Sequence, residues 1–224
     1  MDINIKPSIT TSNSEITKLQ LQFLENNPVD ECGLFLTGLQ SPEERKSFLI
    51  FLNNKLPNLK APLVHVRSDS SVNELQFCID NFNTKYFNLH GNHASEFKKS
   101  ELFTFKDMML AENSKTLTVE QMEEGCFAGI CLDLSHICED VHGDRDWVPD
   151  LQKTLFQYDV NVNHISAVRQ NNYGNLYAEH ICNYKTDMDY LSTIDKKYFG
   201  EYSFLELENT IQKQLEIINY IRNL

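Results

Sequence analysis

Short apolar runs alternate along this chain with segments whose apolar positions recur at the three- to four-residue spacing of a helix. The apolar runs have the length and the branched or aromatic composition of strands. They cover residues 2–8, 32–38, 62–66, 86–90, 108–113, 129–134, 162–168 and 202–208. Strands that alternate with helices in this way predict parallel βαβ units.

The clearest helix starts carry a capping box, in which a Ser or Thr N-cap is followed three positions later by Glu or Gln. Such boxes begin at Ser41, Ser71 and Thr118, and Pro42 occupies the first helical position after Ser41. An apolar stripe over residues 211–221 predicts a C-terminal helix.

Eight strands with helices between most of them predict a small α/β protein, a closed (β/α)₈ TIM barrel that forms a single domain over residues 1–224. An open doubly wound sheet is the alternative, but no GxGxxG or GxxxxGK[ST] loop supports it. Residues 91–107 are weakly patterned, so we expect a short or irregular helix after the fourth strand.

Composition indicates the location of the protein and the kind of partner it binds. The chain begins with DINIKPSIT after Met1, which does not resemble a secretory signal, and it has no apolar run near the ~20 residues of a membrane span. Its six cysteines are scattered without a CxxC pair, which favours reduced thiols and a cytoplasmic location. The formal net charge of −12 disfavours a nucleic-acid partner, which needs clustered Lys and Arg, and favours a small-molecule substrate. Nucleic acid is not excluded, and a homo-oligomer stays open.

Most of the histidines, together with several acidic residues, lie at or just past the ends of the predicted strands. They are His65, His90, Glu112, Asp133, His136, His164 and Glu206, with His180 between the last two strands. In a parallel barrel these ends meet at one mouth. Carboxylate and imidazole bind divalent cations such as Zn²⁺, Mn²⁺, Fe²⁺ or Mg²⁺.

Each of these residues also has an ordinary explanation. A single strand histidine is usually a hydrogen-bonded core residue, and a single strand-end acid such as Asp133 often caps the next helix. Together, however, three clustered carboxylates are costly unless cations accompany them. We therefore expect a metal site.

Four segments resemble the xylose isomerase-like barrel superfamily, which includes sugar isomerases and epimerases and the endonuclease IV-type abasic-site nucleases. The most specific is GICLDLSH at 129–136, whose Asp-x-x-His is similar to the motif of the family's sixth strand. The others are MMLAEN at 108–113, NHIS at 163–166 and FLELEN at 204–209. The resemblance follows the strand order over nearly the whole chain.

The epimerase-like branch implies one metal, held by residues that match Glu112, Asp133, His164 and Glu206. It also implies substrate contacts from His136 and from an arginine after the seventh strand, for which Arg169 is the candidate.

The nuclease-like branch implies three zinc ions, with residues that match His65, His90, His136 and His180 as further ligands. This chain departs from that branch at Ala178-Glu179-His180, where the nucleases have Asp-x-His, and the departure puts the third ion in doubt.

These observations predict an enzyme, a metal-dependent isomerase or epimerase acting on a small sugar or sugar phosphate. Glu112 and Glu206 would exchange a proton with carbon next to a metal-bound oxygen, and His136 would hydrogen-bond the substrate. A metal-dependent phosphoesterase, acting on abasic DNA or a small ester, is the alternative, and a non-catalytic barrel is the third hypothesis. We expect the substrate to be selected by loops over 91–107, 137–149 and 169–177.

Overall fold

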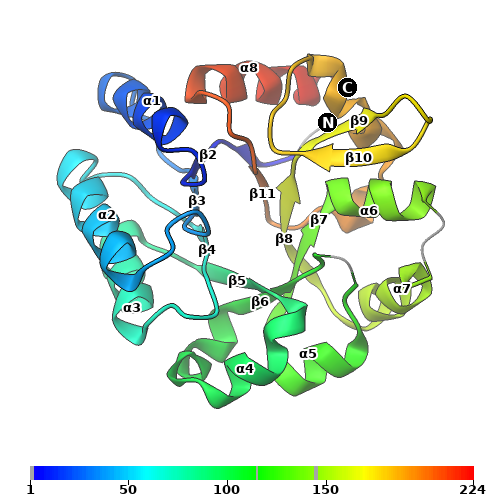
Figure 1. Ribbon diagram of the computed structural model, residues 1–224, viewed down its shortest axis with the longest axis horizontal. Coiled ribbons are helices and arrows are strands. Elements are labelled where there is room, and N and C mark those ends of the chain that lie inside the picture. The colour runs from blue at the N-terminus through cyan, green and yellow to red at the C-terminus, as the bar shows by residue number, and fades with distance from the viewer. Residues whose placement is uncertain (1–2, 115, 144–145) are drawn as a thin grey trace.

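A computed structural model describes residues 3–114, 116–143 and 146–224. Within these ranges nine parallel strands form a nearly closed barrel, and the predicted TIM barrel is confirmed. Figure 1 shows the helices arranged around the barrel. In sheet order the strands are β1 (Ile5–Lys6), β11 (Tyr202–Leu205), β8 (Val160–Ile165), β7 (Gly129–Asp133), β6 (Met109–Glu112), β5 (Tyr86–His90), β4 (Leu63–His65), β3 (Gly33–Phe35) and β2 (Ser8–Thr10).

The two end strands of this sheet, β1 and β2, are halves of one strand interrupted at Pro7. Ile5 lies opposite Ser203 of β11, whereas Ser8 lies opposite Gly33 of β3. Proline has no backbone N–H to donate, which suits a position where the chain changes neighbours. Counted together, the halves give the eight strands expected. The predicted strand over 2–8 is therefore wrong in extent, and its residue 2 lies outside the described residues.

Two buried glutamines close the seam that this interruption leaves between β2 and the segment after β11. The Ser8 N–H donates to Gln214 Oε1 at 2.7 Å, and Gln214 Nε2 donates to Leu207 O at 3.1 Å. Similarly, the Thr10 N–H donates to Gln20 Oε1 at 3.0 Å. Side-chain amides thus bind the backbone groups that a strand partner would otherwise bind.

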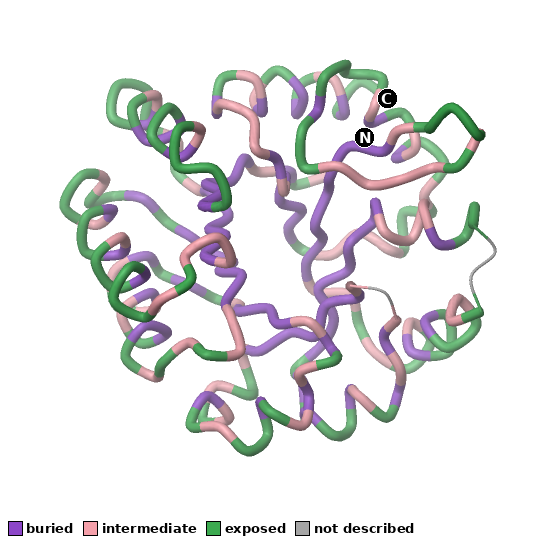
Figure 2. Tube along the Cα trace, viewed as in Figure 1, coloured by how far each residue is buried: buried purple, intermediate pink, exposed green. Residues whose placement is uncertain are grey.

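Eight α-helices of the described part of the chain surround the barrel. Figure 2 shows that its strands are mostly buried and that the outer faces of the helices are exposed. The helices are α1 (Ser14–Asn26), α2 (Pro42–Lys55), α3 (Val72–Phe82), α4 (Ala94–Lys99), α5 (Val119–Gly125), α6 (Leu134–His142), α7 (Val148–Gln157) and α8 (Ile211–Arg222). No helix among the described residues is long and apolar enough to cross a membrane.

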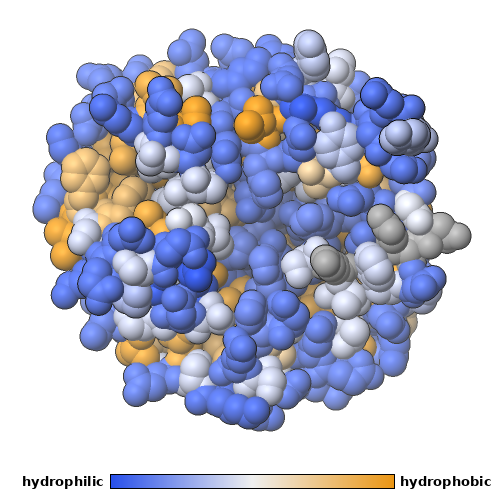
Figure 3. All heavy atoms as spheres, in the orientation of Figure 1, coloured by the Kyte–Doolittle hydropathy of each residue, from blue (hydrophilic) through white to orange (hydrophobic). Residues whose placement is uncertain are grey.

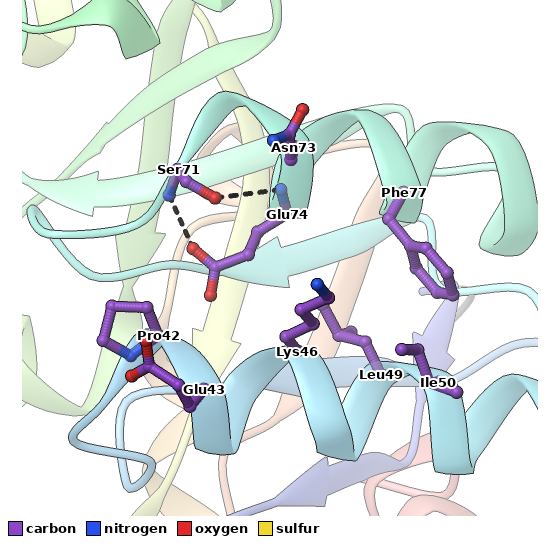
Figure 4. A pocket seen from close by; sticks show the side chains of 9 residues that line it. All are labelled: Pro42, Glu43, Lys46, Leu49, Ile50, Ser71, Asn73, Glu74 and Phe77. Atoms are coloured by element: carbon purple, nitrogen blue, oxygen red, sulfur yellow. Dashed lines mark hydrogen bonds between the residues drawn. The ribbon is translucent and has the colours of Figure 1, made fainter.

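The surface over the middle of the barrel is hydrophilic in Figure 3, and apolar side chains gather toward α1 and α2. There Leu21, Phe48 and Phe51 line a cavity of about 520 Å³ between the two helices. A second cavity of about 400 Å³ lies between α2 and α3 and is lined by Leu49 and Phe77 among others (Figure 4). Neither cavity includes an ionisable residue of the strand ends.

The three predicted capping boxes are present at the starts of α2, α3 and α5. In Figure 4 the Glu74 N–H donates to Ser71 Oγ, and the Ser71 N–H donates back to the Glu74 carboxylate. The expected irregularity over 91–107 is also confirmed, because short 3₁₀ segments (Gly91–His93 and Glu101–Met108) flank α4.

The predicted seventh strand and two of the predicted loops need correction. The run over 162–168 is divided between β8 and β9 (Ala167–Gln170), which forms an antiparallel hairpin with β10 (Leu176–Glu179). The segment 137–149 is mostly helix, in α6 and the start of α7, and its residues 144–145 lie outside the described residues. The segment 169–177 lies within the hairpin, which packs beside α6 (Figure 1).

Candidate metal centre

The ionisable residues gather at the mouth because inward-facing positions recur at every second residue of a strand. A layer inside the barrel is mainly apolar and includes Leu63, Leu110, Cys131, Val162 and Phe204. The residue two positions after each of these is ionisable: His65, Glu112, Asp133, His164 and Glu206. The sequence therefore places this set one layer nearer the carboxyl ends of the strands, where barrel enzymes carry their active sites.

Four of these residues converge on one point. Glu112, Asp133, His164 and Glu206 each offer one ligand atom, and these atoms all lie within 4.8 Å of one another. His164 Nδ1 is 3.2 Å from Glu112 Oε1 and 3.4 Å from Glu206 Oε2. The structure thus brings together the four residues that the sequence indicated for one metal.

A second set shares Glu112 with the first. Ligand atoms of His65, His90 and Glu112 also lie within 4.8 Å of one another. His65 Nε2 is 3.4 Å from Glu112 Oε2, and His90 Nε2 is 3.8 Å from Glu112 Oε1. The Glu112 carboxylate is therefore common to both sets.

The chemistry of both sets fits divalent cations. Glu112 and Asp133 are 2% and 1% exposed, and within the described residues each ion-pair partner of Glu112, Asp133 and Glu206 is a histidine. Buried carboxylates without a fixed cation are costly. In addition, one ring nitrogen of His65 (Nδ1) and one of His164 (Nε2) are buried without a hydrogen-bond partner. Bound cations would compensate the charge that these carboxylates bring together.

The pKa shifts show which groups are charged without a cation. Burial opposes the charge on Glu112, but His65 and His164 outweigh burial and hold the pKa of Glu112 well below its usual range. Burial also opposes the charge on Glu206, while His164 lowers its pKa to about 2. Burial lowers the pKa of His164 too, but Cys131 and Glu112 raise it well above the usual value. Burial lowers the pKa of His65 to about 4, so this imidazole is neutral and able to bind a cation at pH 7.

Neighbouring groups hold the carboxylates in place. Asp133 Oδ1 caps α6 by accepting from the Ser135 N–H at 2.8 Å and the His136 N–H at 3.1 Å, which leaves Oδ2 for the site. The Asn113 side chain accepts from the Asp133 N–H at 2.7 Å and donates to the Asp133 carbonyl at 3.2 Å. Asn88, fully buried, donates to Glu112 Oε2 at 2.5 Å. Asp133 thus caps a helix, as expected of a strand-end acid, and also belongs to the cluster.

His136 and His180 lie at the edge of the cluster. His136 Nε2 is 3.7 Å from Asp133 Oδ2, and the Asp133 charge raises the pKa of His136. His180 Nδ1 is 3.2 Å from the Glu206 carbonyl and 3.8 Å from Glu206 Oε1. Neither histidine belongs to a metal-sized cluster among the described residues, so the structure does not assemble the third site of the nuclease pattern.

Arg169 and Glu179 are engaged with each other rather than with the cluster. Arg169 Nη1 lies 2.6 Å from Glu179 Oε2 across the β9–β10 hairpin, and Arg169 Nε is 3.3 Å from Asp187 Oδ2. This pairing satisfies both charges of the hairpin. It therefore gives no support to Glu179 as a third-metal ligand.

Sequence reasoning missed two residues that the structure brings to the site. Asn88 orients Glu112, and Cys131 lies with Glu112 and His164 in a third ligand-sized set. Burial raises the pKa of the Cys131 thiol to about 12, so it is protonated at pH 7. Both could have been recognised from their spacing: Asn88 lies two positions before His90 and Cys131 two positions before Asp133, so each faces the same side of its strand as that residue.

Comparison with solved structures finds the same architecture at low sequence identity. The xylose isomerase domain protein from Planctomyces limnophilus matches with a TM-score of 0.54 and 11% identity, over 99% of this chain and 96% of that one. SacUVDE matches with a TM-score of 0.51 and 9% identity, over 99% and 98% of the two chains. The IOLI protein, whose structure has a binding zinc atom, matches with a TM-score of 0.50 and 18% identity, over 99% and 95%.

No protein-family model matches the sequence, and a search of curated proteins gives no match either. At these identities the structural likeness establishes the fold. At that level the (β/α)₈ barrel fold expected from the sequence is confirmed.

Proposed function

We propose that this barrel is a metal-dependent phosphoesterase, in which the two residue sets that share Glu112 would hold two divalent cations. The observation that carries the proposal is that Glu112 belongs both to the set with Asp133, His164 and Glu206 and to the set with His65 and His90. In a single-metal isomerase the first set alone would hold the ion, and His65 and His90 would have no metal to bind.

Cations held by these residues would supply Lewis acidity at the phosphoryl group and would activate water for attack. The protein's part is to place ligands, orient substrate and move protons. His136 has a pKa raised by Asp133, so it can hold a proton at Nε2 and donate it to a substrate oxygen. His180, half exposed beside Glu206, is placed to contact the substrate from the opposite edge.

An isomerase or epimerase of small sugars is the second candidate. The four-residue set is complete by itself, and the low pKa values of Glu112 and Glu206 keep both carboxylates ionised as bases. The IOLI structure with its zinc atom is compatible with one ion on such a barrel. The expected small-molecule substrate and cytoplasmic location remain predictions, and a homo-oligomer remains open.

Metal stoichiometry tests the choice between the two candidates. Protein purified without chelator and loaded with Zn²⁺ should bind about two ions per chain and hydrolyse bis(p-nitrophenyl) phosphate. His65→Ala and His90→Ala should each reduce binding to about one ion and remove hydrolysis, whereas His142→Ala, at an exposed position outside both sets, should change neither. One ion in the unmodified chain, with turnover of ketoses and none of phosphate esters, would favour the isomerase.

A further inference from the structure

A cavity of about 250 Å³ opens directly beside the second set of ligands. Two of its lining residues are His65 and His90, so a molecule in the cavity would lie against the cation that these histidines hold. The polar lining is completed by Thr37, Arg67, Ser68 and His93.

The lining of this cavity is rich in nitrogen-bearing side chains, although the chain as a whole carries a net charge of −12. It contains one guanidinium and three imidazoles, and no carboxylate is among its lining residues. Arg67 supplies the fixed positive charge and the imidazoles supply ring nitrogens, which suits an anionic ligand.

The two outer basic groups are held in position and retain binding capacity. Arg67 Nε donates to Asp69 Oδ1 at 2.9 Å, and Arg67 Nη1 donates to the Thr37 carbonyl at 3.2 Å. A guanidinium has five N–H donors, so three remain on a side chain that is 30% exposed. His93 bonds Glu96 through Nδ1 at 2.9 Å and stacks on His90, which leaves its Nε2 for a ligand.

The volume limits what the cavity accepts. At about 30 Å³ per water, 250 Å³ corresponds to roughly eight water molecules. A carboxylate or phosphate on a short carbon chain fits this space, whereas a base pair of duplex DNA does not.

We propose that this cavity binds a second anionic group of the substrate, with Arg67 and His93 as its contacts, while the ester phosphate lies at the cations. The inference rests on the proposed function and narrows its substrate to small phosphate esters that carry a further carboxylate or phosphate. Arg67 serves as the main contact because its planar donors match such groups with two parallel hydrogen bonds.

The test compares two probes that differ only in the second anionic group, methyl phosphate and phosphoglycolate, by calorimetry on the zinc-loaded chain. We expect phosphoglycolate to bind about tenfold more tightly than methyl phosphate, as a charge-assisted hydrogen bond allows. Arg67→Ala should remove this difference and leave the affinity for methyl phosphate and the zinc content unchanged. Arg67→Lys should retain part of it, and Lys98→Ala, on the exposed face of α4, should retain all of it.

Equal binding of the two probes by the unmodified chain, or an undiminished difference in Arg67→Ala, would overturn the inference. Because the readout is binding rather than turnover, the outcome is separate from that of the proposed function. A chain that discriminates the probes through Arg67 but hydrolyses no phosphate ester would uphold the anion site and reject the phosphoesterase.

Discussion

Asn88 shows how a single neutral residue orients the candidate metal centre. It lies two positions before His90 on β5, completely buried, and its Nδ2 donates to Glu112 Oε2. Its own Oδ1 has no hydrogen-bond partner, although it is buried. An unpaired buried polar atom lowers the stability of the fold, and such atoms are found at functional sites.

Asn88→Ala should weaken zinc binding about 10- to 100-fold, because Glu112 loses the donor that fixes its carboxylate. The measurement is competition with a chromophoric chelator. Asn81→Ala, at a partly buried amide on α3 away from the mouth, should leave zinc affinity unchanged and serves as the matched control. Unaltered affinity in Asn88→Ala would show that Glu112 needs no such support.

Zinc binding should release protons and weaken as the pH falls from about 8 to about 6. Without a cation the pKa of His164 is raised well above its usual value, so this imidazole carries a proton that the ion must displace. Glu112 and Glu206 have lowered pKa values, are already ionised and release none. Calorimetry in two buffers of different ionisation enthalpy counts the protons, and a pH-independent affinity would contradict the assigned state of His164.

At this scale the sequence indicated four residues that the structure brings together, because an ionisable residue two positions past a buried apolar one faces the same side of its strand. Asn88 was missed, since an amide within a strand carries no charge signal and only its inward phase marks it. Nor could the sequence show that Arg169 would be neutralised by Glu179 and Asp187, because that depends on a hairpin that the apolar pattern did not separate from its neighbouring strand.

At the scale of elements, the seam at Pro7 distinguishes this barrel from a uniform one. The backbone of β2 finds its partners toward β11 through the buried side chains of Gln20 and Gln214 rather than through a strand. Neither glutamine can be identified from periodicity, because each occupies an inward helix position that usually holds an apolar residue.

Gln214→Leu should lower the free energy of unfolding of the zinc-free chain by about 2–4 kcal/mol, since the Ser8 N–H and the carbonyls it serves become unpaired in a buried place. Urea unfolding measures the change. Gln22→Leu, on the exposed side of α1, should stay within about 0.5 kcal/mol of the unmodified chain. A Gln214→Leu chain as stable as the Gln22→Leu chain would show that water replaces the amide.

The β9–β10 hairpin was the element least accessible to sequence reasoning. Its first strand continues an apolar run from β8 after one intervening residue, Ser166, so the two strands read as one. Its turn did carry a signal, because Gly174 adopts a φ of +85° that favours glycine. The alternation of strands and helices, in contrast, was sufficient to predict the barrel itself.

At the scale of the whole molecule, the cation should contribute directly to stability. If zinc binds the folded chain as proposed, its ligands are far apart in the unfolded chain, so at a free concentration about 100 times Kd it should stabilise the fold by about 2.7 kcal/mol. Thermal unfolding with and without Zn²⁺ measures this, and a chelator should reverse it. Glu112→Gln, which removes the ligand common to both sets, should lose most of the zinc-dependent shift.

The residues of the first set come from β6, β7, β8 and the position just after β11. A bound ion would therefore cross-link Glu112 on β6 to Glu206 after β11. Coordination would then close a long chain segment much as a disulfide does, but reversibly. Metal supply would set how long such a molecule survives a protease. A protease should therefore digest the chelated protein faster than the metal-loaded one, so that the supply of the cation would help to determine the lifetime of the protein.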